Sequence, residues 1–411
     1  MALSREVLNF VANTGGTTTT VNTSFLPKAL ILVSHFKTTE GESATARYSF
    51  GVSDSTNHRC IGWAGDDAAA TSNVIGGFRT DAALEIYIDG ATVAQRVTGV
   101  AFNSGNFVLT WSGTPASAWE ISAIVFGGDD PTNISVGSIA MPTSIQVQNV
   151  TTVGFQGDFG LFFHGGRTTS GFSTNPKQSL GAAISPTKRW VMDLVVRDAQ
   201  TTSAAVNAMS TVDDTAILEG HAASTNALEF LGDFDGFTAD GFNIDWTTVP
   251  ASAYLYAWLI IKGGQWDLGI STKPAGATTQ TVTGMAFTPT LVSWAMSSAT
   301  ALATSTSEAT STVGVWDGTT EIYAGAYHND AINTVAKSAG ASTKVLRELN
   351  YTAEADGTSL NSDGWTITWT DTGTAYLVPW WAAASSGAAP PPPPAFGDYA
   401  GQFKIIRPTL W

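Results

Sequence analysis

A chain of 411 residues has room for two to four domains, and only 13% of its residues are charged, against about 25% in an average soluble protein. Its formal net charge of −15 argues against a nucleic-acid groove or an anionic membrane surface, because both are bound by clustered Lys and Arg. No apolar run reaches the ~18 residues of a membrane span, and the single cysteine, Cys60, excludes an intrachain disulfide. We therefore expect no nucleic-acid partner and no membrane insertion.

The first residues lack the basic and apolar regions of a signal peptide. We expect synthesis in a cytoplasm without export through a secretory route.

The first predicted elements are a polar strand and an apolar strand within residues 21–34, separated by a bend at Pro27. The second strand is continuously apolar, which is typical of a strand buried on both faces. A pair of strands around a turn at residues 54–57 follows, and similar pairs surround residues 186–188 and 317–319. Segments 66–80, 198–213 and 329–342 are rich in small polar residues, and we expect long loops there, each with at most a short strand or a helical turn.

A strand, a turn near Pro250 and a second strand are predicted within residues 241–260, as a hairpin. The same unit recurs at residues 106–119 and 364–376. Trp111, Trp246 and Trp369 take the inward phase of these strands, so we expect them in cores. They recur at intervals of roughly 130 residues, which is too long for a solenoid repeat and fits whole small domains.

These patterns predict an all-β protein of three tandem antiparallel β-sandwich, jelly-roll-like domains. The predicted division is 1–130, 131–264 and 265–385, then a Pro-rich linker at 386–395 and a C-terminal assembly peptide at 396–411. Both junctions between domains are short, so we expect the domains to sit end to end.

The C-terminal peptide is too apolar to remain exposed. It follows five prolines that form a stiff spacer of roughly 15 Å. We expect it to dock on another subunit or a neighbouring domain, adding a strand to a sheet edge. Its candidate contact residues are Phe396, Tyr399, Phe403, Ile405, Ile406, Leu410 and Trp411.

Candidate chemistry is sparse. The five histidines, at positions 35, 58, 164, 221 and 328, lack metal-ligand spacing. Asp233, Asp235 and Asp240 precede the central predicted hairpin in what we interpret as a solvated loop, with calcium binding as the alternative, although their spacing does not match an EF-hand. The pairs at residues 66–67 and 213–214 are interpreted as loop ends, with a carboxylate pair for glycoside hydrolysis as the alternative.

No nucleophile elbow, phosphate loop or dinucleotide fingerprint occurs in the required strand-to-helix setting. The best-defined features are repeated three times and are architectural, so we expect no catalytic residues, no metal, no cofactor and no enzymatic activity.

The phrase at residues 281–292 and the segment 240–246 with its following Ala-Ser-Ala-Tyr turn resemble β-rich repeats of tailed-bacteriophage virion structural proteins. The resemblance covers residues 8–385, and it implies a virion component on the tail, the baseplate or the head, with no catalytic residues to carry over. The first copy departs from it, since it has Ser104-Gly105-Asn106 where the others have Asp-Gly.

The leading hypothesis is a tail or baseplate fibre-like protein used in assembly or host attachment. Its partners would be other virion proteins, further copies of the chain (a trimer is plausible) and a host-surface glycan. The alternatives are a capsid decoration or head-fibre protein and an array of carbohydrate-binding or depolymerase modules. For the last, Trp258, Trp380, Trp381 and Trp411 are candidates for sugar stacking as well as for cores or subunit contacts.

Overall fold

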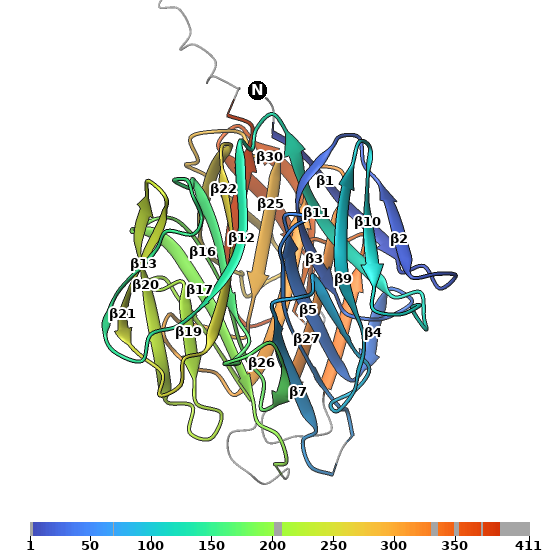
Figure 1. Ribbon diagram of the computed structural model, residues 1–411, viewed down its shortest axis with the longest axis vertical. Helices are drawn as coiled ribbons and strands as arrows, with labels where there is room; N and C mark the ends of the chain where they lie inside the picture. The colour runs from blue at the N-terminus through green and yellow to red at the C-terminus, as the bar shows by residue number, and fades with distance from the viewer. Residues whose placement is uncertain are drawn as a thin grey trace, which may run out of the picture.

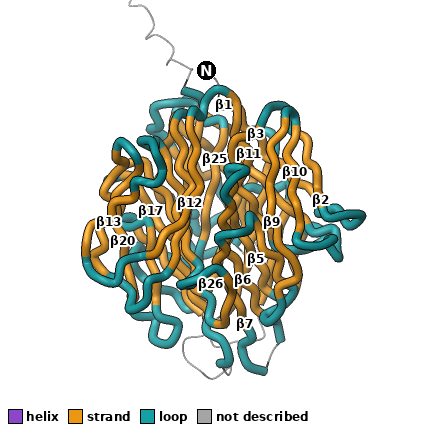
Figure 2. Tube along the Cα trace, in the orientation of Figure 1, coloured by secondary structure: helices purple, strands orange, loops and turns teal. Residues whose placement is uncertain are grey.

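The computed structural model describes residues 3–68, 70–200, 208–329, 336–348, 353–370 and 373–386. Within these ranges the chain forms strands and loops and no helix, as Figure 2 shows, so the all-β prediction is confirmed. It follows that the described ranges hold no helix with the length and apolarity needed to cross a membrane. The predicted C-terminal assembly peptide and all but the first residue of the Pro-rich linker lie outside the described residues.

The first repeat, residues 1–130, forms one large and one small antiparallel sheet. The large sheet has the order β1-β11-β3-β5-β6-β7, and the small sheet has the order β2-β10-β9-β8. The strands are β1 (Leu3–Val11), β2 (Thr18–Asn22), β3 (Pro27–Ser34), β4 (Gly41–Ala44), β5 (Ala46–Ser53), β6 (His58–Gly65), β7 (Val74–Arg79), β8 (Leu84–Tyr87), β9 (Val93–Asn103), β10 (Asn106–Trp111) and β11 (Glu120–Gly128).

The second repeat, residues 131–264, is built in the same way. Its large sheet has the order β12-β22-β14-β16-β17-β18, and its small sheet has the order β13-β21-β20-β19. The strands are β12 (Asn133–Ala140), β13 (Gln146–Val150), β14 (Phe159–His164), β15 (Gly171–Thr174), β16 (Lys177–Ser185), β17 (Lys188–Val196), β18 (Ala208–Asp213), β19 (Leu218–His221), β20 (Leu228–Thr238), β21 (Gly241–Thr248) and β22 (Leu255–Lys262).

The third repeat, residues 265–385, follows the same plan. Its large sheet has the order β23-β32-β25-β26-β27-β28, and its small sheet has the order β24-β31-β30-β29. The strands are β23 (Gln265–Thr272), β24 (Thr279–Val282), β25 (Leu291–Met296), β26 (Glu308–Trp316), β27 (Glu321–Asn329), β28 (Ala336–Ala341), β29 (Leu346–Arg347), β30 (Glu354–Asn361), β31 (Gly364–Trp369) and β32 (Leu377–Ala384).

Each large sheet is buried on both faces. In β3, Ile31 and Val33 face a central core shared by all three repeats, whereas Leu30 and Leu32 face the small sheet of their own repeat. Figure 1 shows the first repeat in blue on the right, the second in green and yellow on the left, and the third in orange and red behind them. The predicted end-to-end arrangement is therefore wrong: the repeats lie side by side, because the second apolar face of each large sheet needs a partner.

The repeats also exchange strands in a ring. Strand β15 of the second repeat pairs with β7 of the first, and β4 of the first repeat pairs with β28 of the third. The third repeat reaches the second through an isolated antiparallel bridge between Thr306 and Ser210. The first and second repeats thus each add a strand to the large sheet of another repeat, and the third repeat adds one bridge to the large sheet of the second. The three-domain division and its jelly-roll-like topology stay predictions.

The predicted terminal hairpins are wrong. Strands β21 and β22 do not pair with each other: β21 pairs with β13 and β20, and β22 pairs with β12 and β14. The turn near Pro250 therefore carries the chain from the small sheet to the large one, and β10–β11 and β31–β32 do the same. The alternating pattern of β21 suits a sheet with one solvent face, and the continuous apolar pattern of β22 suits a sheet covered on both faces.

The predicted strand pairs around residues 54–57, 186–188 and 317–319 are confirmed as β5–β6, β16–β17 and β26–β27. The three segments predicted as long loops each contain the last strand that a repeat contributes to its own large sheet, namely β7, β18 and β28.

Three equivalent glycines allow the large and small sheets to approach. A Cβ on Gly51, Gly181 or Gly314 would lie 2.0, 2.2 or 1.7 Å from the carbonyl oxygen of Ala83, Ile217 or Val345. Backbone atoms cannot move aside as a flexible side chain can.

We therefore expect Gly181→Ala to destabilise the protein by about 1–3 kcal/mol in urea unfolding. Gly276→Ala is the control, since a Cβ there meets no atom within 4 Å, and its effect should stay within about 0.5 kcal/mol. Equal effects of the two substitutions would contradict this account of the sheet contact.

Candidate functional site

The second repeat holds a buried polar cluster, defined as His164, Asp193, Thr211, Glu219 and His221. His164 ends β14, Asp193 lies within β17, Thr211 lies within β18, and the other two lie on β19. All five are buried in strands whose neighbours are mostly apolar. Two of the five histidines, far apart in the sequence, therefore meet at one place.

Asp193 is the centre of this cluster. His221 donates from Nδ1 to Asp193 Oδ2 at 3.0 Å, and His221 Nε2 lies 3.5 Å from Glu219 Oε1. Thr211 donates its hydroxyl to the same Glu219 oxygen at 3.1 Å. The imidazole of His221 is thus held between two carboxyl groups.

His164 is bonded to the backbone through both ring nitrogens. The backbone N–H of Gly166 donates to its Nδ1 at 3.0 Å, so the ring proton is on Nε2, which donates to the Glu219 carbonyl oxygen at 2.9 Å. Asp193 Oδ1 lies 3.8 Å from that Nε2. Because both ring nitrogens are engaged with the backbone, His164 has no free lone pair to offer a metal ion.

Two groups of the cluster, Glu219 and His221, have a raised pKa. Burial, and then the charge of Asp193, raises the pKa of Glu219 to about 8. Burial lowers the pKa of His221, but its hydrogen bond to Asp193 and the charges of Asp193 and Glu219 outweigh burial and raise that pKa above its usual value. At neutral pH burial therefore favours the protonated form of Glu219, and the hydrogen bond to Asp193 favours the protonated form of His221.

This arrangement offers a substrate little access. The side chains of His164 and Asp193 are fully buried, and those of Glu219 and His221 are 4% and 10% exposed. The only hydroxyl placed in it, that of Thr211, donates to Glu219 and has no base set to deprotonate it. In the described part of the chain, no three His, Cys, Asp or Glu side chains are arranged to hold a metal ion.

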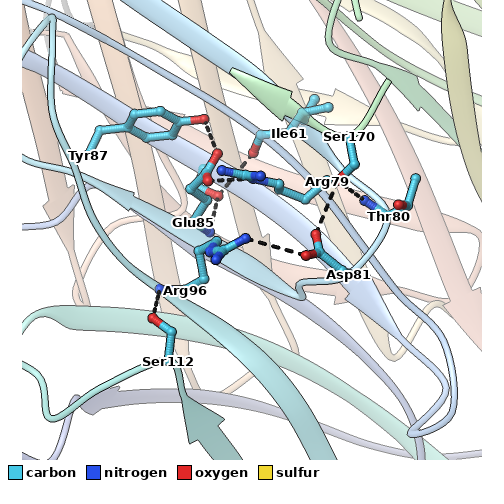
Figure 3. A network of polar contacts seen from close by, with 10 residues as sticks. Ile61, Arg79, Thr80, Asp81, Glu85, Tyr87, Arg96, Ser112 and Ser170 are labelled. Carbon is cyan, nitrogen blue, oxygen red and sulfur yellow. Dashed lines mark hydrogen bonds and ion pairs between the residues drawn. The ribbon is translucent and has the colours of Figure 1, made fainter. Parts of the chain in front are cut away.

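The first repeat has a polar cluster at the corresponding place, drawn in Figure 3. Glu85 follows Ala83 by two residues just as Glu219 follows Ile217. Arg79 Nε donates to Glu85 Oε1 at 2.6 Å, and the Tyr87 hydroxyl donates to Oε2 at 2.7 Å. The ring of Phe172, on the exchanged strand β15, lies 5.8 Å from the Arg79 guanidinium carbon. The cluster therefore adjoins a strand exchange.

A second contact at this junction ties the two repeats directly. Figure 3 shows Ser170 of the second repeat beside Asp81, to which its hydroxyl donates at 3.1 Å. Asp81 also pairs with Arg96 at 3.3 Å. Burial, helped by the Glu85 carboxylate, raises the pKa of the Tyr87 hydroxyl well above its usual value, so Tyr87 acts here as a hydrogen-bond donor.

The third repeat places Arg347 at the same position. Its guanidinium pairs with Glu354 at 3.2 Å and with Glu42, which lies on the exchanged strand β4 of the first repeat. The polar groups at this position thus contact a neighbouring repeat in the first and third copies. In the second copy they bond to residues of their own repeat.

A buried ion pair lies elsewhere in the third repeat. Lys273 Nζ is 3.5 Å from Glu348 Oε2, donates to the carbonyl oxygens of Pro274 and Thr374, and lies 5.3 Å from the centre of the Trp369 ring. Burial raises the pKa of Glu348 to about 7, although the charge of Lys273 opposes the shift. These bonds hold the end of β23 against the small sheet.

The remaining histidines do not gather. Burial, and then the charge of Lys37, lowers the pKa of His35 to about 4, and its ring packs against Gly340 of the third repeat. His58 bonds the Ser53 hydroxyl across the β5–β6 turn, and His328 packs against Gly65 of the first repeat.

The predicted carboxylate sites lie within strands or directly beside them. Asp66 and Asp67 accept backbone N–H groups, as does Asp213 in its turn, which fits the loop-end interpretation. The interpretation of Asp233 and Asp235 as loop residues is wrong, since both lie in β20, where Asp233 faces Asp245 across the sheet.

The predicted core tryptophans are confirmed. Trp111, Trp246 and Trp369 are at most 3% exposed. The candidates for sugar stacking, Trp258, Trp380 and Trp381, are at most 6% exposed and belong to the cores. Trp411 lies outside the described residues.

Two open grooves lie at the seams between repeats. One, of about 560 Å³, is lined by residues of the first and second repeats that include Lys28, Asn57, Phe102 and Asn133. The other, of about 340 Å³, lies between the second and third repeats. Neither is lined by the polar clusters described above.

Sequence reasoning missed Asp193 and Glu219. The available signal was a single acid inside an apolar strand, which must find a partner when it is buried. No protein-family model matches the chain, and no curated protein is significantly similar to it.

Proposed function

We propose that the chain is a non-enzymatic structural component of a bacteriophage virion, a fibre-like element of the tail or baseplate used in assembly or host attachment. The ring of strand exchanges around one shared core supports this proposal best. Three copies of one unit, which separate chains of a trimer would otherwise supply, are joined here in a single chain. Charged side chains of the first and third repeats contact a neighbouring repeat at the strand exchanges.

A rigid body of this kind suits a particle component. Both faces of each large sheet are covered, and the sheet edges β7 and β28 are covered by exchanged strands, which leaves fewer places for unwanted strand pairing. The described chain starts and ends at the same end of the body, where the backbone N–H of Leu3 donates to the Ser385 hydroxyl. An anchor beyond Ser386 would let the opposite end project.

The test is to purify particles of the phage that encodes the chain and to locate the chain by mass spectrometry and gold-labelled antibody. We expect the chain in intact particles, with label on the tail or baseplate. Label on the head would favour the decoration or head-fibre alternative. Absence from particles that still infect would overturn the proposal.

A host-surface glycan remains a proposed partner. The seam groove lined by Phe102, Asn57 and Asn133 joins an aromatic ring with two amides, which are the groups that bind sugars. A glycan array with the purified chain tests this, and a Phe102→Ala chain is its control.

A further inference from the structure

The outer edge of the second small sheet differs from its two counterparts. In each repeat an indole N–H donates to a side chain on the edge strand, which sets the three edges in register. These bonds run from Trp111 to Thr19 on β2, from Trp246 to Gln148 on β13, and from Trp369 to Gln280 on β24. Residues that lie the same number of positions before or after these three acceptors in the sequence are therefore equivalent.

The residue directly before each acceptor faces outward, and it is apolar only in β13. Val147 stands there, where β2 and β24 have Thr18 and Thr279. Its neighbour across the sheet is Asp245, where the other repeats have Thr110 and Thr368. A Thr–Thr pair on two edges is thus replaced by a Val–Asp pair on the third.

Two large apolar side chains are exposed along this edge. Ile145 is 71% exposed and Val147 is 52% exposed, which are high values for β-branched residues. Strand β13 is the outermost strand of its sheet and pairs on one side only. An exposed apolar edge with one row of backbone groups unpaired is a site for strand addition.

A row of acids lies beside these apolar residues. Asp245 pairs in register with Val147 on one side and with Asp233 on the other, so all three side chains share one face. Burial raises the pKa of Asp233, Arg189 opposes the shift, and the charges of Asp213 and Asp245 add to it. A strand added at this edge could cover the exposed apolar side chains and place a cation near the two acids.

The chain itself contains such a segment. In residues 402–407, Gln-Phe-Lys-Ile-Ile-Arg, the alternate residues Phe403, Ile405 and Arg407 would share one face of an extended strand. This face offers two apolar side chains for Ile145 and Val147 and a cation for the acidic row. The segment is cationic in a chain whose net charge is −15.

The point at which the described chain ends fits a contact between copies. The Ser386 backbone N–H donates to Asp130 Oδ2 at 2.9 Å, which fixes the exit point, and the five prolines at 390–394 are expected to stiffen the next stretch over roughly 15 Å. A stiff spacer that begins four residues after this exit would favour a contact of the segment with another copy over one with its own body.

We propose that residues 402–407 of one copy add as a fifth strand to the β13 edge of a second copy. This names the receiving surface for the assembly contact, and so it rests on the proposed structural role. Backbone hydrogen bonds would supply affinity, and the Val147 and Asp245 positions would select β13 over β2 and β24.

The first test is self-association of the full chain, measured by sedimentation velocity over a wide range of concentrations. Changing Ile145 and Val147 together to threonine is expected to weaken association at least about tenfold. Thr18→Ser on the equivalent β2 edge is the matched control and should leave it unchanged. A full chain that stays monomeric at every concentration would overturn the proposal.

Charge reversal distinguishes a specific contact from non-specific association. Asp245→Arg and Arg407→Asp should each weaken association, and the two changes should restore it when combined in one chain. If the combined variant is as weak as the worse of the two, the proposed pairing of these charges is wrong.

Cross-linking identifies the two chains involved. Val147→Cys in one tagged chain and Ile405→Cys in a second chain of different tag are mixed and mildly oxidised, and Cys60 does not compete because it is only 1% exposed. A disulfide between the two tags is the expected result. A chain carrying both cysteines that closes only on itself would overturn docking on a second copy. None of these results depends on a particle, so they can fail while the virion assignment stands.

Discussion

Replacing Trp381 with alanine is expected to destabilise the whole protein by about 4 kcal/mol, because a large side chain leaves a cavity in a shared core. Trp381 is 4% exposed. Its ring centre lies 6.3 Å from Phe126 of the first repeat, 5.2 Å from Phe159 of the second and 6.0 Å from Trp266 of the third. One side chain thus contacts all three repeats.

Urea unfolding followed by circular dichroism and by fluorescence measures the effect. The two probes should coincide in a single transition for the native chain, because the large sheets of all three repeats pack on one core. Trp381→Ala should move that whole transition, and Trp381→Phe, which keeps a ring, should move it less. Separate transitions in the native chain would show that the repeats unfold independently.

Much of the fold could be predicted from the sequence because strand patterns are local. The alternation of Phe242, Ile244 and Trp246 marks a strand with one solvent face, and the structure places it in a small sheet. The continuous run at Ala29 to Val33 marks a strand buried on both faces. This second pattern already carried the information that the large sheets need another apolar layer, which is incompatible with sandwiches arranged end to end.

The strand exchange could not be predicted in this way. Strands β4 and β15 have the sequences Gly-Glu-Ser-Ala and Gly-Phe-Ser-Thr, and alternate residues in each are exposed. A short strand that adds at a sheet edge binds through its backbone, and backbone hydrogen bonds leave little trace in side-chain patterns. The same reason explains why the predicted hairpins were wrong. Which strand pairs with which depends on contacts throughout the fold and not on the local sequence pattern.

Only part of the polar cluster of the second repeat could be predicted from the sequence. Asp193 stands between Met192 and Leu194 in an apolar strand, which marks it as a buried acid in need of a partner. Its partner, His221, lies 28 residues further along and on the other sheet, so spacing alone could not identify it.

Raising the pH is expected to weaken the native protein through this cluster, and Glu219→Gln should remove part of that effect. The pKa of Glu219 is about 8 in the folded protein against an ordinary value of 4.5. Between these values the folded chain holds a proton that the unfolded chain releases, so stability falls as pH rises, by about 1.4 kcal/mol per pH unit for a full proton. The raised pKa of His221 acts with the same sign, since its contribution is lost as pH rises through that pKa.

A glutamine at position 219 stays neutral at every pH, keeps the size of the side chain and can still accept the Thr211 hydroxyl proton. The variant and the native chain should be similarly stable near pH 5, and the variant should be more stable by on the order of 3 kcal/mol above pH 8. Urea unfolding across this pH range measures the difference.

Glu85→Gln, at the equivalent position of the first repeat, is the contrasting control. Glu85 pairs with Arg79, so its loss leaves a cation without its partner and should destabilise the protein at neutral pH. Parallel stability curves for the native chain and Glu219→Gln would mean that Glu219 is already ionised in the fold, and that His221 alone compensates both carboxylates.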